Sequence, residues 1–152
     1  MKALADELEV PPLIAQLLLV RGASSPELGY RFLNPSVEDL CDPFDLQGVD
    51  RAVERLRVAR ERGEKVLVFG DYDVDGITGT AILHNALRDY GLDSSTYDMP
   101  NRLEEGYGLS PERVYQAREE QVDLIVTVDN GITAREAADA AREAGIGLIV
   151  TD

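Results

Sequence analysis

The chain has 152 residues, of which 44% are hydrophobic and 29% charged, with a single cysteine at position 41. This length suits one domain with a substantial core. No apolar run reaches the roughly 18 residues that a membrane span needs, and the N-terminus has no secretory leader pattern. A lone cysteine cannot form an intramolecular disulfide, so we expect a cytoplasmic protein with no membrane partner.

The formal net charge of −14 excludes a generally basic surface for nucleic acid, because neutralising phosphates requires clustered lysines and arginines. It does not exclude a nucleic-acid substrate. Carboxylates that surround divalent cations count as negative in this sum, although the bound ions would offset them.

Residues 1–47 contain short helical pieces broken by proline and glycine, LEVPPLIAQLLLVRG followed by SPELGYRFLNP. They predict a small N-terminal helical extension. An amphipathic helix over 48–63 connects it to the rest of the chain. We therefore expect two parts, the extension at 1–47 and a larger domain at 48–152.

From Val66 onward, short apolar runs alternate with amphipathic stretches. The runs predict strands at 66–69, 95–99, 122–128 and 147–151, and the stretches predict helices at 77–90, 110–120 and 133–145. Alternating strands and helices with continuously apolar strands indicate an α/β fold, an open and mainly parallel sheet with helices on both faces.

The stretch GDYDVDG at 70–76 places three aspartates, Asp71, Asp73 and Asp75, directly after the first predicted strand. The same spacing opens a calcium-binding EF-hand loop. That loop needs a preceding helix and a glutamate at its twelfth position, which here is Ile82. The EF-hand hypothesis therefore fails.

Two further aspartates follow other predicted strands, Asp129 after 122–128 and Asp152 after 147–151. The carboxyl ends of parallel strands share one edge, where open α/β sheets bind ligands. Five carboxylates gathered there could not all stay ionised without cations, and oxygen ligands suit magnesium or manganese. Taken singly, each aspartate has the alternative role of a turn or cap residue.

The segments GDYDVDGITGTA, NRLEEGYGLS, VDNGIT and IVTD, in this order, resemble the motifs of the DHH phosphoesterase family, and specifically its single-stranded-DNA exonucleases. The stretch FLNPSVEDLCDPFDLQGVDRAVERL resembles their helical lead-in. The resemblance implies a truncated DHH-type domain. It also implies a two-metal enzyme that removes nucleotides from single-stranded DNA in the 5′ to 3′ direction, in DNA repair and recombination, with other repair proteins as partners.

The same resemblance implies roles for individual residues. Asp73 and Asp75 would each ligate one Mn²⁺ or Mg²⁺ ion, and Asp129 would bridge the two, so these three would be catalytic. Asp71 would be a metal ligand or a hydrogen-bond acceptor behind a metal ligand. Asp152 would be the aspartate of the Asp-His-His triplet. Gly76 and Gly131 would let backbone approach the substrate.

Arg102 and Tyr107 are the other candidate substrate contacts. The arginine would hold a phosphate and the tyrosine would stack on a base. The alternative for both is a solvated glycine-rich connection.

Two departures from the family pattern affect these expectations. Phe69 stands where many relatives have a histidine, and the sequence stops at Asp152, before the two histidines of the triplet. We expect an N-terminal fragment of such an enzyme that lacks part of the active site, binds manganese weakly and has little nuclease activity alone.

Three other functions stay open at this point. A DHH-family phosphoesterase acting on pyrophosphate, cyclic dinucleotides or short oligonucleotides would use the same aspartates. A haloacid-dehalogenase-type phosphatase would use Asp73 as a nucleophile, but it needs a downstream lysine, and none follows Lys65. An acidic interaction module would use no catalysis.

Overall fold

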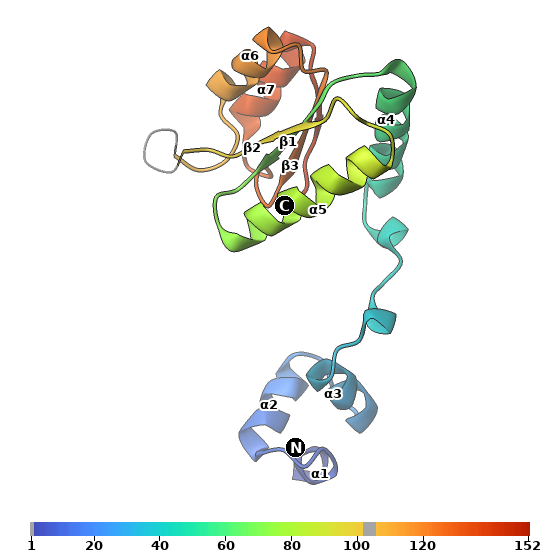
Figure 1. The fold of residues 1–152 in the computed structure, drawn as a ribbon. Coiled ribbons are helices and arrows are strands. Elements are labelled where there is room, and N and C mark those ends of the chain that lie inside the picture. Colours follow the sequence, from blue (N-terminus) through green and yellow to red (C-terminus); the bar gives the residue numbers. More distant parts are fainter. Residues whose placement is uncertain (1, 102–105) are drawn as a thin grey trace. The chain divides into compact units, whose positions relative to one another are not determined.

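The computed structural model describes residues 2–101 and 106–152. The chain divides into two compact units, Met1–Gln47 and Gly48–Asp152 (Figure 1).

The first unit is helical. Its apolar centre is small, formed by Leu4, Ala5 and Ala15, and the side chain of Ser25 caps one helix by accepting from Leu28 N. The helices are α1 (Lys2–Glu7), α2 (Pro12–Val20) and α3 (Pro26–Leu33), followed by two short 3₁₀ turns, η1 (Val37–Asp39) and η2 (Pro43–Asp45).

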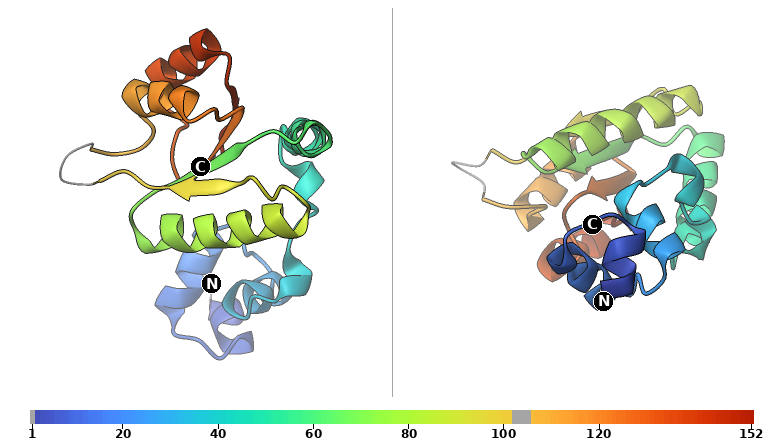
Figure 2. Two further views of the ribbon diagram at one scale, coloured as in Figure 1. Left: turned by 45° about the horizontal axis from the view of Figure 1, so that its top comes forward. Right: turned by 90° about the horizontal axis from the view of Figure 1, so that it is seen from below.

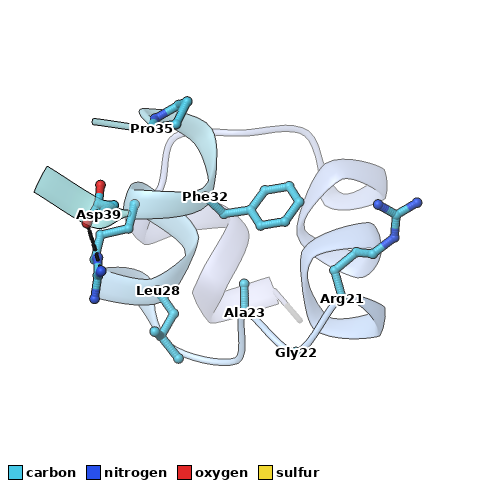
Figure 3. A pocket seen from close by; sticks show the side chains of 8 residues that line it. Arg21, Gly22, Ala23, Leu28, Phe32, Pro35 and Asp39 are labelled. Atoms are coloured by element: carbon cyan, nitrogen blue, oxygen red, sulfur yellow. Dashed lines mark hydrogen bonds and ion pairs between the residues drawn. The ribbon is translucent and has the colours of Figure 1, made fainter. Parts of the chain in front are cut away.

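A shallow hollow lies in this first unit, with Arg21, Leu28 and Phe32 among its lining residues (Figure 3). On its rim, Arg31 and Asp39 form an ion pair at 2.7 Å. The hollow therefore contains one compensated charge pair and exposed apolar side chains, Phe32 being 52% exposed.

The second unit is built on a four-stranded sheet with the order β2-β1-β3-β4, and every pairing is parallel. The strands are β1 (Val66–Gly70), β2 (Thr96–Asp98), β3 (Leu124–Val128) and β4 (Gly147–Ile149). The two central strands are almost completely buried, because helices cover both faces. The predicted open α/β sheet is confirmed.

Four helices supply these covers: α4 (Val49–Arg62), α5 (Val74–Asp89), α6 (Pro111–Glu119) and α7 (Arg135–Ala144). Ala59 of α4 and Leu87 of α5 pack with Val66 and Val68 on one face of the sheet. Val114 of α6 and Ala140 of α7 pack in the cluster on the other face. Figure 2 shows α5 on one side of the strands and α6 and α7 on the other.

Some element bounds differ from the sequence prediction. Helix α5 begins at Val74 rather than at 77, because the Asp73 side chain caps it there. Strand β3 begins at Leu124, two residues later than predicted, and β4 ends at Ile149. The earlier start of α5 places Asp75 in the first turn of a helix instead of a loop.

Within the described ranges, no helix is both long and apolar enough to cross a membrane.

Candidate metal centre

The site lies where the strand order changes direction. From β1 the chain passes through α5 to β2 on one side, and from β3 it passes through α7 to β4 on the other. Because α5 and α7 cover opposite faces, the chain segments that leave β1 and β3 diverge. Such a switch point opens a crevice at the carboxyl ends of the strands, which is where open α/β sheets bind ligands.

Three aspartates meet at this crevice. Asp71 follows β1 directly, Asp73 comes two residues later, and Asp129 follows β3. One carboxylate oxygen from each lies within 4.8 Å of the others, close enough to hold a metal ion together. We call these three residues the acidic group.

The capping of α5 fixes Asp73. Its Oδ1 accepts hydrogen bonds from the backbone N–H groups of Asp75 at 2.9 Å and Gly76 at 3.0 Å. An N-cap aspartate satisfies donors that the first helical turn leaves free, and its negative charge is favourable at that end of the helix. The helix thus holds this carboxylate at the crevice.

Asp71 is only 3% exposed. Its Oδ1 is buried and has no hydrogen-bond partner among the described residues. Gly76 packs directly on its backbone, since a Cβ at that glycine would lie 2.4 Å from Asp71 O. A buried carboxylate oxygen without a partner is costly. A divalent cation would remove that cost, so the residues present fit a metal ion with oxygen ligands.

Asp129 has a left-handed backbone conformation with φ of 60°, which aspartate tolerates better than most residues. Partial desolvation raises the pKa of its carboxyl group, and the negative charges of Asp73, Asp75, Asp71 and Asp152 raise it further. Repulsion among like charges is the effect that a bound cation would reverse.

Asp75 and Asp152 lie outside the acidic group as its geometry defines it. Asp75 is exposed in the first turn of α5. A carboxylate oxygen of Asp152 accepts a hydrogen bond from Ile132 N at 3.0 Å. Both charges nevertheless act on Asp129, so both belong to the same electrostatic environment.

Tyr107 lies beside the acidic group. Its hydroxyl donates to the backbone oxygen of Asp129 at 3.2 Å, and its ring meets Tyr72 edge to face, with 6.3 Å between centroids. Partial desolvation raises the pKa of its hydroxyl, and the charges of Asp71 and Asp152 add to the shift. Since the side chain is 64% exposed, its ring is accessible to a ligand.

The remaining predicted substrate contacts differ in their placement. Arg102 lies outside the described residues. Gly131 has φ of +110°, a conformation that favours glycine, and packs against the Thr127 side chain. Gly76 serves the site through its close contact with Asp71.

The sequence prediction missed polar residues behind the acidic group. Asn130 is completely buried and its amide bonds to the backbone of both β1 and β3. Thr151 donates through Oγ1 to Thr127 O at 2.6 Å, which extends the connection between β3 and the end of the chain beyond Ile149. The signal in the sequence was a polar residue next to an aspartate at a strand end, Asn130 after Asp129 and Thr151 before Asp152.

The chain resembles known proteins along nearly its whole length. Residues 65–152 match the model of the DHH family, N-terminal domain. The exonuclease RecJ of Bacillus subtilis, described as single-stranded-DNA-specific, is 36% identical over 99% of this chain and 19% of its own length. RecJ of Escherichia coli, described in the same words, is 44% identical over 95% of this chain and 24% of its own length.

Two solved structures are similar in fold. One, described as exonuclease RecJ bound to manganese, matches with a TM-score of 0.66 and 44% identity, covering 70% of this chain and 27% of that one. The other, RecJ from Thermus thermophilus in complex with Mn²⁺, matches with a TM-score of 0.68 and 34% identity, covering 98% of this chain and 20% of that one.

The present chain therefore spans about a quarter or less of the length of these relatives. The family match includes the DVDGI stretch at 73–77, which the haloacid-dehalogenase hypothesis used. That stretch, the parallel sheet and the acidic group at its switch point all agree with one assignment: the chain belongs to the DHH family.

Proposed function

We propose that this chain supplies metal-binding residues of an exonuclease that degrades single-stranded DNA in the 5′ to 3′ direction, with Mn²⁺ or Mg²⁺ as cofactor. The observation that carries the proposal is the acidic group, in which three carboxylates converge at a switch point and one buried oxygen has no partner among the described residues. The relatives described as single-stranded-DNA-specific exonucleases support the substrate.

Asp71, Asp73 and Asp129 would hold the first ion. Asp75, in the first turn of α5, and Asp152, which follows β4, would help to hold a second ion. The charge of each also acts on Asp129. Bound divalent ions supply a Lewis acid and an activated water for phosphodiester hydrolysis.

The chain's own groups would orient the substrate. The exposed Tyr107 ring offers a face for an unpaired base, and its hydroxyl bond to Asp129 O sets its distance from the acidic group. Arg102, which lies five residues before Tyr107 in the sequence, would bind a phosphate.

We place the protein in the cytoplasm, in DNA repair and recombination, together with other repair proteins. The relatives' activity on single-stranded DNA supports this role, since that substrate arises when damaged duplexes are processed.

Binding and activity need separate experiments. Titrating the 152-residue chain with Mn²⁺ in a calorimeter should give saturable binding that Asp73→Asn abolishes. The protein encoded by the complete reading frame should release nucleotides from the 5′ end of single-stranded DNA, but not from duplex DNA. Preference for pyrophosphate or a cyclic dinucleotide would instead assign a small-substrate phosphoesterase, and no manganese binding would contradict the proposal.

A further inference from the structure

Asn130 lies completely buried beneath the crevice, at 0% exposure. Its side-chain nitrogen donates two hydrogen bonds, to Phe69 O at 3.1 Å and to Val128 O at 2.9 Å. Both amide hydrogens are therefore used, each on a backbone oxygen. This pairing also fixes the orientation of the amide, because its oxygen could not face two carbonyls.

The two acceptors belong to different strands. Phe69 is in β1, two residues before Asp71, and Val128 ends β3, one residue before Asp129. The pair Gly70↔Val128 is the last of the β1–β3 ladder. Asn130 thus connects the two strands at the point where their backbone pairing stops and their chains diverge.

The turn that carries Asn130 has an unusual backbone. Asp129 before it has φ of 60° and Gly131 after it has φ of 110°. Two left-handed positions that flank a single residue need an anchor that selects them. The buried amide, fixed to both strands, is that anchor.

The two ends of the Asn130 amide are not equally satisfied. The Asn130 oxygen is buried and accepts no hydrogen bond from the described residues, a cost that an apolar side chain would avoid. The two donated bonds account for the residue. These bonds hold the backbone on either side of the crevice. Each accepting residue lies within two residues of a member of the acidic group.

We propose that Asn130 is a positioning residue that sets the separation between Asp71 and Asp129 and thereby makes the acidic group competent to bind a divalent cation. This inference rests on the proposed function. Residues behind metal ligands commonly determine affinity because they orient the ligands.

The test measures Mn²⁺ affinity by calorimetry and thermal stability by circular dichroism on the 152-residue chain. Asn130→Ala should weaken manganese binding by about 10- to 100-fold, the range typical of residues behind metal ligands. Val122→Ala is the matched control, because Val122 is also completely buried but precedes the opposite end of β3. It should lower the melting temperature and leave the affinity of the folded protein unchanged.

A second variant separates geometry from charge. Asn130→Asp keeps the size of the side chain but loses the donors, and its added negative charge alone would tighten cation binding. Weaker binding by Asn130→Asp supports positioning, and this variant decides the question if Asn130→Ala does not fold. In the unchanged chain with Mg²⁺, the two amide hydrogens of Asn130 should also exchange slowly with solvent in NMR spectra.

The outcomes are distinguishable from those of the proposed function. If the unchanged chain does not bind manganese, the proposed function fails and this inference falls with it. If the unchanged chain binds and Asn130→Ala binds equally well, or Asn130→Asp binds more tightly, only the positioning role is overturned. Rapid exchange of the Asn130 amide hydrogens would also contradict it.

Discussion

The carboxyl ends of β1 and β3 differ from the carboxyl end of β2, although aspartates stand at all three. Asp98 at the end of β2 is neutralised by Arg113, whose Nε lies 2.7 Å from its carboxylate, and it also accepts from Met99 N. Among the described residues, the acidic group at β1 and β3 has no such ion pair, and one of its oxygens is buried and unpaired.

The difference separates a structural carboxylate from a binding one. Arg113 is buried. In addition to the bond from its Nε to Asp98, its Nη2 donates to a carboxylate oxygen of Glu120 at 3.2 Å. It ties β2 to α6. The acidic group instead keeps repelling charges together at an edge, where, within the part of the chain that the structure describes, only the capping bonds of Asp73 offset the repulsion until a cation binds.

The largest effect is expected from a substitution that removes one carboxylate of the acidic group. Asp129→Asn should lower manganese affinity by more than the roughly 10- to 100-fold that changes behind a ligand cause, because it removes a ligand itself. Without metal, the melting temperature should rise, since one of the repelling charges is gone. Calorimetric titration and thermal unfolding measure both effects. Asp93→Asn is the control, because Asp93 is an exposed aspartate on the loop before β2. An equal loss of manganese affinity in that control would show that the acidic group is not a distinct binding site.

The second prediction concerns the ion pair between Arg113 and Asp98 at the end of β2. Arg113→Met should lower the free energy of unfolding by about 2 kcal/mol, between the roughly 3–5 kcal/mol of a buried pair and the roughly 0–1 of an exposed one, because Asp98 is 42% exposed. Manganese affinity of the folded protein should not change. Urea unfolding and calorimetry provide the two values. Weakened manganese binding would place Arg113 in the functional site.

The third prediction concerns pH. The folded state raises the pKa of Asp129 above 3.8, so the folded protein holds a proton that the unfolded chain has already lost. Without metal, stability should therefore decrease as pH rises from about 3.8 through the raised pKa. Manganese affinity should change in the opposite sense, increasing over the same range as the carboxylate ionises. Asp129→Asn should flatten both curves, and an unchanged pH profile in that variant would assign the titration to another group.

The smallest effect should come from Tyr107→Phe. Removing the hydroxyl breaks its bond to Asp129 O, which is worth about 0.5–1.5 kcal/mol when formed inside a protein, and this one is largely exposed. Manganese affinity should fall less than in Asp129→Asn, and the phenyl ring should retain the contact with a base. Tyr115→Phe, which removes another exposed hydroxyl bond, to Glu143, is the matched control.

The sheet and the convergence of Asp71, Asp73 and Asp129 could be predicted because they follow from local patterns. Apolar runs such as Val66–Gly70 define parallel strands, and parallel strands place their ends at one edge. The start of α5 could not be fixed in the same way. Asp and Gly are weak helix formers, so the capping bond of Asp73 to Gly76 N decides where this helix begins.

Other features depend on residues far apart in the sequence. Asn130 donates to a carbonyl 61 positions away. Arg113 pairs with Asp98, 15 positions away, for which the sequence pattern predicts only a place at the end of a strand. Neither contact has a periodic signature. The position of Asp152 outside the acidic group likewise involves a distant residue, since its carboxylate accepts from Ile132 N, 20 positions away.

The most direct measurement is an anomalous-difference map from crystals of this chain grown with Mn²⁺. A peak bounded by the carboxylates of Asp71, Asp73 and Asp129, lost in Asp129→Asn, is the predicted result. An empty acidic group in crystals at saturating Mn²⁺ would contradict the account, as would manganese bound only at other carboxylates such as Asp98.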